Sequence, residues 1–215
     1  CKNNQFYLHI TTDYELPKNE TKIKEVGIDL GLKNIVVGSD GLKIENVNHA
    51  KYFDKEIAKL QQRQSKCKKG SRKYKYYRTV MNRLYNMKVR KMNDFQHKVS
   101  RRLANTYDTI YAEDLSVKRM MQSNKTGLNK SVGNAKLSQL LILLGYKVNH
   151  LVLVNPKNTS KTCNSCGFIH KSLELKDRTI TCQCGATYDR DENASKNILC
   201  LGQAISSKRC TESAT

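Results

Sequence analysis

Four cysteines in the C-terminal part of the chain form two closely spaced pairs, Cys163-x-x-Cys166 and Cys182-x-Cys184. Thiolates hold Zn²⁺ tetrahedrally, and a cysteine pair at the tip of a turn presents two sulfurs to one ion. Gly167 and Gly185 each follow a pair, where glycine lets the backbone amides turn toward the sulfurs without a Cβ clash. The spacing predicts a structural zinc ribbon over residues 160–188, because four thiolates leave no open position for a substrate.

The segment behind the second cysteine pair is acidic and has the pattern of a helix start. Asp189 and Asp191 lie there, and carboxylates are favourable near a helix N-terminus because they complement the helix dipole. The pattern predicts a last helix over residues 189–203, ended by Gly202, and a tail over residues 204–215. The predicted ribbon therefore leads directly into a helix whose first turn is acidic.

Basic residues greatly outnumber acidic ones, with 39 Lys and Arg against 19 Asp and Glu and a net charge of +20 over 215 residues. Such an excess produces a positive field that attracts polyanions, and neutralised phosphates release counterions when a nucleic acid binds. The charges are clustered, and one basic turn contains Lys68, Lys69, Arg72 and Lys73. We expect this turn to bind a nucleic acid backbone; the alternative is a solvated surface without a ligand.

The chain contains no run of 18 apolar residues and no charged-then-apolar leader, so its sequence predicts neither a membrane span nor a secretory signal. Half of the eight cysteines have metal-ligand spacing, and the others are scattered, namely Cys1, Cys67, Cys200 and Cys210. This usage indicates reduced thiols rather than a disulfide scaffold. We therefore expect a cytoplasmic, nucleoid-associated location without a membrane partner.

Short apolar runs bounded by glycines over residues 26–47 predict three short antiparallel strands joined by tight turns. Apolar residues then recur at helical spacing, which predicts a helical hairpin over about residues 51–106 with a cationic outer surface. Strands are expected over residues 109–115 and 147–154, on either side of an apolar helix over residues 137–144.

The resulting order is strand, strand, strand, two helices, strand, helix, strand, helix. This order is typical of a ribonuclease H-like fold, an α/β class with a mixed sheet, here with a helical hairpin insert and a small inserted zinc ribbon. In such a sheet the strand that carries Asp29 lies beside the strand that carries Glu113. The final helix brings Asp191 over the same end of the sheet, so we expect the three carboxylates to meet.

Each of these carboxylates has an ordinary explanation when taken alone: a turn aspartate for Asp29, a solvated side chain for Glu113 and a helix cap for Asp191. Together they favour a metal site, because adjacent carboxylates repel one another unless cations lie between them. Their oxygens suit Mg²⁺ or Mn²⁺, and two such ions promote phosphodiester cleavage. In that scheme Asp29 bridges both metals, and each of the other two carboxylates completes one coordination shell.

Four ordered sequence blocks resemble the TnpB family, RNA-guided nucleases of insertion sequences that are related to type V CRISPR effectors: VGIDLGLKN, IYAEDLSVKRM, TSKTCNSCG and DRDENASKNIL. The resemblance covers nearly the whole chain from Val26 to Leu201. It implies a transposon-encoded endonuclease with a RuvC-like site, a guide RNA and a DNA target. It also implies that Asp29, Glu113 and Asp191 are catalytic, that the four paired cysteines hold zinc, and that Arg190 contacts the scissile phosphate.

Members of this family generally carry an N-terminal barrel and a helical recognition region. Residues 1–25 contain only QFYLHITT, which resembles the last strand of the barrel, before a linker. The chain also begins at Cys1 rather than at Met. We therefore expect a truncated protein, in which residues 26–159 form the RuvC-like domain and residues 160–188 form the zinc ribbon.

Two other functions are weighed against cleavage. The first is a non-catalytic nucleic-acid-binding remnant or regulator of transposition that keeps the fold and the charge. The second is a strand-transferring transposase. One transposase class needs a His-apolar-His pair, and no two of the five histidines have that spacing. The other class usually has the acidic order Asp, Asp, Glu, whereas the order here is Asp, Glu, Asp.

Overall fold

The computed structural model describes residues 8, 10, 11, 13, 24–47, 49–115, 135–173 and 177–212. Of the strand expected in QFYLHITT only residues 8, 10 and 11 are described, and most of the linker after it lies outside the described residues. Within the described residues, no helix combines the length and the apolar character needed to cross a membrane.

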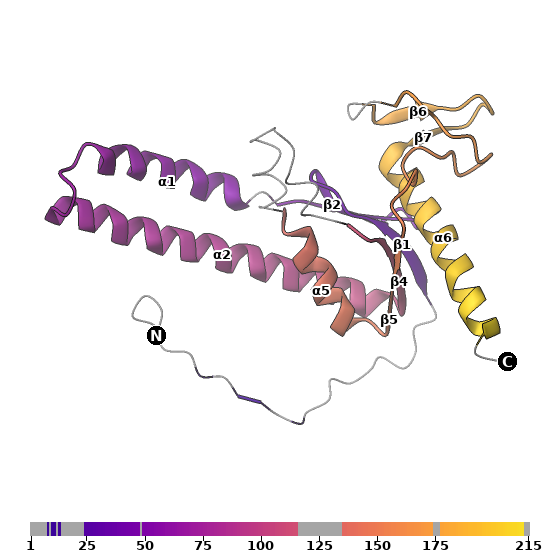
Figure 1. Ribbon diagram of the computed structural model, residues 1–215, viewed down its shortest axis with the longest axis horizontal. Helices are drawn as coiled ribbons and strands as arrows, with labels where there is room; N and C mark the ends of the chain where they lie inside the picture. Colours follow the sequence, from indigo (N-terminus) through magenta and orange to yellow (C-terminus); the bar gives the residue numbers. More distant parts are fainter. Residues whose placement is uncertain are drawn as a thin grey trace.

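A five-stranded mixed sheet with the order β3-β2-β1-β4-β5 lies at the centre of the molecule (Figure 1). Its strands are β1 (Glu25–Asp29), β2 (Asn34–Gly38), β3 (Lys43–Glu45), β4 (Thr109–Glu113) and β5 (His150–Val154). The first three pair antiparallel, as the short apolar runs and tight turns predicted, whereas β4 runs parallel to both β1 and β5. Strand β4 is buried on both faces because helices cover both sides of the sheet, which explains its nearly continuous apolar sequence.

The parallel register between β1 and β4 determines where the acidic residues lie. Ile28 pairs with Ala112, and each of these residues is followed by the last residue of its strand, Asp29 and Glu113 respectively. Parallel strands point their carboxyl ends the same way, so both side chains reach the same edge of the sheet. The expectation that these two strands are neighbours is confirmed.

The predicted helical hairpin is also present, formed by α1 (His49–Ser65) and α2 (Arg72–Thr106). The Ser71 side chain caps α2 by accepting a hydrogen bond of 3.2 Å from the Tyr74 amide. Farther along, Lys88 of α2 and Asp54 of α1 form a mostly buried ion pair of 2.8 Å that ties the two helices together. The hairpin projects away from the sheet, and only the C-terminal part of α2 packs against it (Figure 1).

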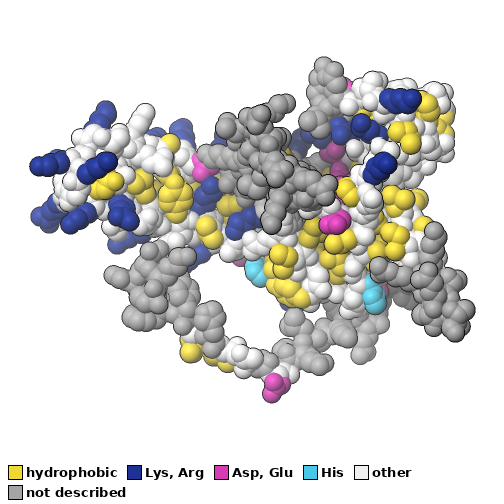
Figure 2. All heavy atoms as spheres, viewed as in Figure 1, with side chains coloured by type: hydrophobic (Ala, Val, Ile, Leu, Met, Phe, Trp, Pro, Cys, Tyr) yellow, Lys and Arg dark blue, Asp and Glu magenta, His cyan; other side chains and the backbone are white. Residues whose placement is uncertain are grey.

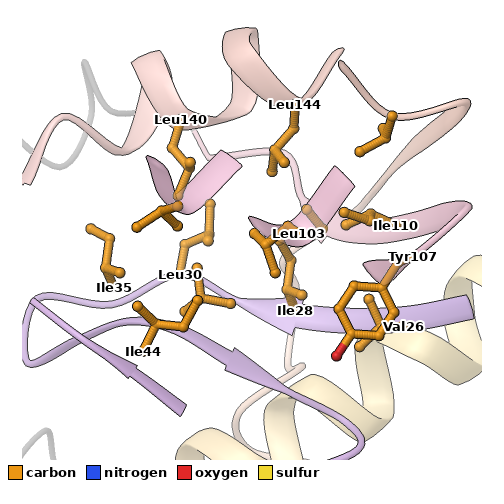
Figure 3. Close-up of a cluster of buried hydrophobic side chains, with 14 of the residues drawn as sticks. Val26, Ile28, Leu30, Ile35, Ile44, Leu103, Tyr107, Ile110, Leu140 and Leu144 are labelled. Atoms are coloured by element: carbon orange, nitrogen blue, oxygen red, sulfur yellow. The ribbon is translucent and has the colours of Figure 1, made fainter. Parts of the chain in front are cut away.

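The main hydrophobic core lies between one face of the sheet and the helices α2 and α5 (Leu137–Lys147). Ile28 and Ile110 from adjacent strands meet Leu103 of α2 and Leu144 of α5, and all four are completely buried (Figure 3). Burial of side chains of this size contributes about 1.5–3 kcal/mol each. This packing fixes β1 and β4 side by side.

The last helix, α6 (Arg190–Glu212), covers the opposite face of the sheet (Figure 1). A Cβ atom on Gly27 of β1 would lie 2.2 Å from the Ser195 carbonyl oxygen, and one on Gly202 would lie 2.0 Å from the Tyr111 ring. Glycine at these positions therefore allows helix and sheet to approach closely. The prediction that Gly202 ends this helix at about residue 203 is wrong, because the glycine serves packing and the helix continues to Glu212.

The cysteine module packs beside the N-terminal end of α6 (Figure 1). It contains the two-stranded antiparallel pair β6 (Thr179–Thr181) and β7 (Thr187–Asp189), together with a bridge between Thr162 and Ile169. Strand β7 ends at Asp189 and α6 begins at the next residue. The module is thus continuous with the helix that carries Asp191, as its sequence position predicted.

Candidate active site and metal centre

Asp29, at the end of β1, is influenced by the charges of both other acidic residues. Burial, followed by the charges of Glu113 and Asp191, raises the pKa of its carboxyl group to about 7. Arg190 acts in the opposite direction, as does a hydrogen bond from the Leu30 amide. The carboxylates of β1, β4 and α6 therefore gather at one edge of the sheet, with Arg190 beside them.

Glu113 is partly buried at the end of β4, and burial raises the pKa of its carboxyl group. The hydroxyl of Thr159 donates a hydrogen bond to Glu113 Oε1, which lowers that pKa again. Thr159 is itself 3% exposed and lies in the loop after β5. Thr159 is the first residue of the TSKTCNSCG block, but nothing in the sequence indicates that it contacts a carboxylate 46 positions away.

Asp191 lies in the first turn of α6 and is held from two sides. Its backbone amide donates a hydrogen bond of 2.9 Å to Asp189 Oδ1, which also accepts from the Glu192 amide at 3.2 Å. Asp189 is thus the helix cap. The carboxylate of Asp191 pairs with Arg178 at 2.9 Å, and Glu192 pairs with Lys43 of β3 at 2.7 Å.

The three carboxylates are close but do not form a tight cluster. Among the described residues, only the four paired cysteines bring all of their ligand atoms within 4.8 Å of one another. Glu113 is turned toward Thr159 and Asp191 toward Arg178. A two-metal site does not require one compact cluster, because its ions lie about 3.5–4 Å apart and share only the bridging ligand. A donor set of carboxylate oxygens that repel one another fits Mg²⁺ or Mn²⁺.

The four cysteines form a group that can bind a metal such as zinc. The sulfurs of Cys163 and Cys184 lie 3.9 Å apart, and those of Cys166 and Cys182 lie 3.6 Å apart. Four sulfurs at 2.3 Å from a tetrahedral zinc ion would be separated by about 3.8 Å. A disulfide needs about 2.05 Å, so the spacing matches shared metal ligation and not oxidation.

Backbone conformation and hydrogen bonds shape both turns around these sulfurs. Gly167 and Gly185 adopt positive φ angles of 75° and 84°, which supports the predicted reason for glycine there. Burial disfavours the Cys163 thiolate, but amide hydrogen bonds from Cys166 and Ser165, together with the Tyr188 hydroxyl, lower its pKa to about 6. These hydrogen bonds favour the thiolate form at Cys163. At Cys166, a hydrogen bond from the Phe168 amide lowers the pKa, but the neighbouring cysteine sulfurs raise it above its usual value.

Two buried asparagines of α6 connect this cysteine module to the rest of the fold. Asn193 donates to the Thr162 carbonyl at 2.6 Å and accepts from the Asn164 amide at 2.9 Å. Asn197 donates to the carbonyls of Thr162 at 2.7 Å and Thr159 at 2.8 Å. Their i, i+4 spacing places both amides on one helix face. That spacing is visible in DRDENASKNIL, but the hydrogen-bond partners of the two asparagines are not.

The predicted nucleic-acid-binding residues divide into two groups. Arg190 lies at the carboxylate edge and donates to the Ser160 hydroxyl at 3.4 Å. Lys68, Lys69, Arg72 and Lys73 are exposed at the tip of the α1–α2 hairpin, where basic side chains gather in Figure 2. A helix of 35 residues such as α2 is about 50 Å long. The tip is therefore remote from the carboxylates.

This arrangement of sheet and helices is similar to that of solved RNA-guided endonucleases. One is Cas12f1 in its complex with sgRNA and target DNA, with a TM-score of 0.57, 18% identity and coverage of 86% of this chain and 51% of that one. Another is the mini-RNA-guided endonuclease CRISPR-Cas_phi3, with a TM-score of 0.52, 14% identity and coverage of 83% and 44%. These likenesses define the class of fold.

Family models identify the chain more closely. A model described as a probable transposase, OrfB_IS605, matches residues 7–124, and a model of the Cas12f1-like TNB domain matches residues 138–198. Because the first match spans more than half of the sequence, the chain belongs to the OrfB_IS605 transposase family. The resemblance to TnpB seen in the sequence blocks is thereby confirmed.

Relatives from bacteria and a virus carry corresponding names. A Streptomyces pristinaespiralis protein named "Putative RNA-guided DNA endonuclease" is 36% identical over 84% of this chain and 46% of its own length. InsQ of Escherichia coli, with the same description, is 29% identical over 94% and 55%. TnpB-like protein L79 of Acanthamoeba polyphaga mimivirus is 32% identical over 92% and 40%. The chain spans about half the length of these relatives.

Proposed function

We propose that this chain is the nuclease part of a TnpB-like RNA-guided DNA endonuclease and that it hydrolyses phosphodiester bonds at Asp29, Glu113 and Asp191. The observation that carries the proposal is that Asp29 and Glu113 end adjacent parallel strands and that the charges of Glu113 and Asp191 both act on the carboxyl group of Asp29. The names of the relatives and the fold of the solved endonucleases support it.

In this proposal Asp29, Glu113 and Asp191 would hold Mg²⁺ or Mn²⁺ through their carboxylate oxygens. Bound there, the ions would activate a water and stabilise the leaving oxygen. Arg190 lies beside Asp29, and its guanidinium can bind an oxygen of the scissile phosphate. Burial of Asp29 keeps its carboxylate away from bulk water and strengthens its attraction for a cation.

The cysteine group has a structural role in the proposal. We infer that zinc at Cys163, Cys166, Cys182 and Cys184 stabilises the module that begins after Thr159 and ends in β7. Because β7 continues directly into α6, an ordered module also orders the first turn of that helix, which carries Asp191. The buried amides of Asn193 and Asn197 strengthen the same connection.

We infer that guide RNA and target DNA bind across the basic surface of the molecule. The net charge of +20 and the exposed cations of the hairpin tip support this inference. Lys68 and Arg72 are remote from the carboxylates, so they would bind phosphates away from the cleavage point. Such a nuclease would act in the cytoplasm, at the nucleoid.

A second candidate is a non-catalytic nucleic-acid-binding protein that regulates transposition, which is favoured by the pairing of Asp191 with Arg178 and by the lack of a tight carboxylate cluster among the described residues. A cleavage assay with Mg²⁺, a guide RNA and the native upstream segment restored distinguishes the two. The first function predicts cleavage that Asp29→Ala or Glu113→Ala abolishes while DNA binding is retained. Glu56→Gln, which changes an exposed carboxylate of α1, serves as the matched control. Absence of cleavage by the unsubstituted protein under these conditions contradicts the nuclease function.

A further inference from the structure

Thr159 is a buried residue that touches two of the elements that form the proposed site. Its hydroxyl donates to Glu113 Oε1 at the end of β4. Its carbonyl accepts a hydrogen bond of 2.8 Å from Asn197 of α6, the helix that carries Asp191. Both Thr159 and Asn197 are almost fully buried, with 3% and 8% exposure. A single residue therefore connects the strand that ends at Glu113 to the helix that begins beside Asp191.

The direction of the Thr159 hydroxyl is informative because that group has only one hydrogen to donate. The Pro156 carbonyl lies 3.2 Å from the same oxygen and offers a local partner in the loop. The Glu113 carboxylate is the closer acceptor, and a hydrogen bond to an ionised group is about twice as strong as one to a neutral carbonyl. The hydroxyl is thus committed to Glu113.

The loop itself does not need this hydroxyl for its anchorage. Asn197 holds the loop through two carbonyls, those of Thr159 and Thr162. Asn193 adds a bond of 2.6 Å to Thr162. With the backbone fixed in this way, the side-chain hydroxyl is a rigid donor aimed at the end of β4. Ligands of catalytic metals require such outer partners, whose loss typically weakens metal binding about 10–100-fold.

We propose that Thr159 is a positioning residue that orients the Glu113 carboxylate relative to Asp191, and that Asn197 holds Thr159 in place for this task. The inference rests on the proposed function, because it assigns Glu113 as a metal ligand. It goes beyond that function because it makes the orientation of the Glu113 carboxylate depend on α6. The connection runs through the loop that contains Thr159 and enters the cysteine module. Thr159 does not touch the reacting atoms and acts only through Glu113.

Three variants of the full chain test the inference, with the Mn²⁺ affinity measured by electron paramagnetic resonance in the absence of nucleic acid. Thr159→Val removes the hydroxyl with little change of shape, and we expect it to weaken Mn²⁺ binding about 10–100-fold. Thr159→Ser keeps the hydroxyl and should restore most of the affinity. Glu113→Gln removes the ligand itself. Zinc content and melting temperature are recorded for each variant, and neither should fall substantially in Thr159→Val.

The double variant Glu113→Gln, Thr159→Val separates positioning from a general structural role. If Thr159 acts through Glu113, the valine substitution has no further effect on Mn²⁺ affinity once Glu113 is changed. An equal loss in both backgrounds overturns the inference. The inference is also overturned if Thr159→Val leaves the Mn²⁺ affinity unchanged while Glu113→Gln alone weakens Mn²⁺ binding. If Glu113→Gln leaves the affinity unchanged, the proposed metal site is wrong and the inference falls with it. Thr159→Ala replaces Thr159→Val if the valine variant does not fold.

Discussion

The guanidinium of Arg178 donates from Nη1 to both carboxylate oxygens of Asp191, at 2.9 and 3.2 Å. Arg178 stands directly before β6, and Asp191 lies in the first turn of α6. A cation of the cysteine module therefore already pairs with the Asp191 carboxylate. If Asp191 holds a divalent ion, as we propose, Arg178 and that ion would compete for the same two oxygens.

Substitution of Arg178 tests this competition. Its side chain is 53% exposed, and an exposed pair contributes only about 0–1 kcal/mol. We expect Arg178→Gln to strengthen Mn²⁺ binding by up to about fivefold, the factor that corresponds to 1 kcal/mol. Lys59→Gln, which breaks an exposed pair on α1, should leave the affinity unchanged. Weaker binding in Arg178→Gln would show that Arg178 positions Asp191 and does not compete with the metal.

The raised pKa of Asp29 makes the stability of the protein depend on pH when no Mg²⁺ or Mn²⁺ is bound at the carboxylates. Because the folded-state pKa is about 7 and the ordinary value is 3.8, the folded state binds the proton more tightly than the unfolded state. Stability therefore falls as pH rises from the lower value to the higher one and is constant above it. We expect Asp29→Asn to raise the free energy of unfolding of the chain without Mg²⁺ or Mn²⁺. The increase should be about 2 kcal/mol larger at pH 8 than at pH 5.5.

Thermal unfolding of the zinc-loaded protein, followed by circular dichroism, measures this effect. Added Mg²⁺ should raise the melting temperature of the unsubstituted chain, because the ion binds the folded state only. It should have much less effect on Asp29→Asn. A variant that melts below the unsubstituted chain at pH 8 would contradict the assigned environment of Asp29.

Close packing between β1 and α6 predicts a severe effect of a single methyl group at Gly27. The added Cβ would lie 2.2 Å from a carbonyl oxygen and 2.5 Å from an amide nitrogen of the helix backbone, neither of which can rotate away. We expect Gly27→Ala to lower the free energy of unfolding by about 1–3 kcal/mol. Gly145→Ala is the control, because its Cβ would make ordinary contact at 3.8 Å. Denaturant titration that ranks the two variants equally would argue against this packing.

Loss of a zinc ligand should destabilise α6, because the cysteine module is continuous with that helix. Cys163→Ser removes a buried sulfur of the four-cysteine group, so we expect loss of bound zinc and a lower melting temperature. Elemental analysis and circular dichroism measure the two effects. Cys67→Ser changes a free thiol at the hairpin turn and should alter neither. Full zinc content in Cys163→Ser would contradict the ligand assignment.

Features that depend on local backbone geometry were predictable from the sequence. The cysteine pairs, the glycines after them and the acidic helix start all follow from turn and helix conformations that span a few residues. The pairing of β1 with β4 was also predictable, because the order of elements restricts how a mixed sheet can be connected. The role of Gly202 was not predictable, because a glycine that ends a helix and a glycine that allows close packing cannot be distinguished in a sequence.

The side-chain partners of the site residues could not be predicted from the sequence, for a different reason. Thr159 and Glu113 are 46 positions apart, and Asn197 and Thr159 are 38 apart. Each contact is determined by how α6, β4 and the intervening loop pack, and sequence spacing carries no information on that packing. Polar residues at such positions have many possible partners, and burial forces each of them to find one.

By itself, the sequence determined the chemistry that is available: four thiolates at metal spacing, three carboxylates at the ends of elements, and a large positive charge. These follow from residue identity and local spacing, as did the family resemblance. Only the tertiary structure decided how the carboxylates are held. Glu113 is turned toward Thr159, Asp191 toward Arg178, and both of their charges act on Asp29. The reason is physical: burial and hydrogen-bond geometry arise when distant segments pack, and they set the charge and direction of each side chain.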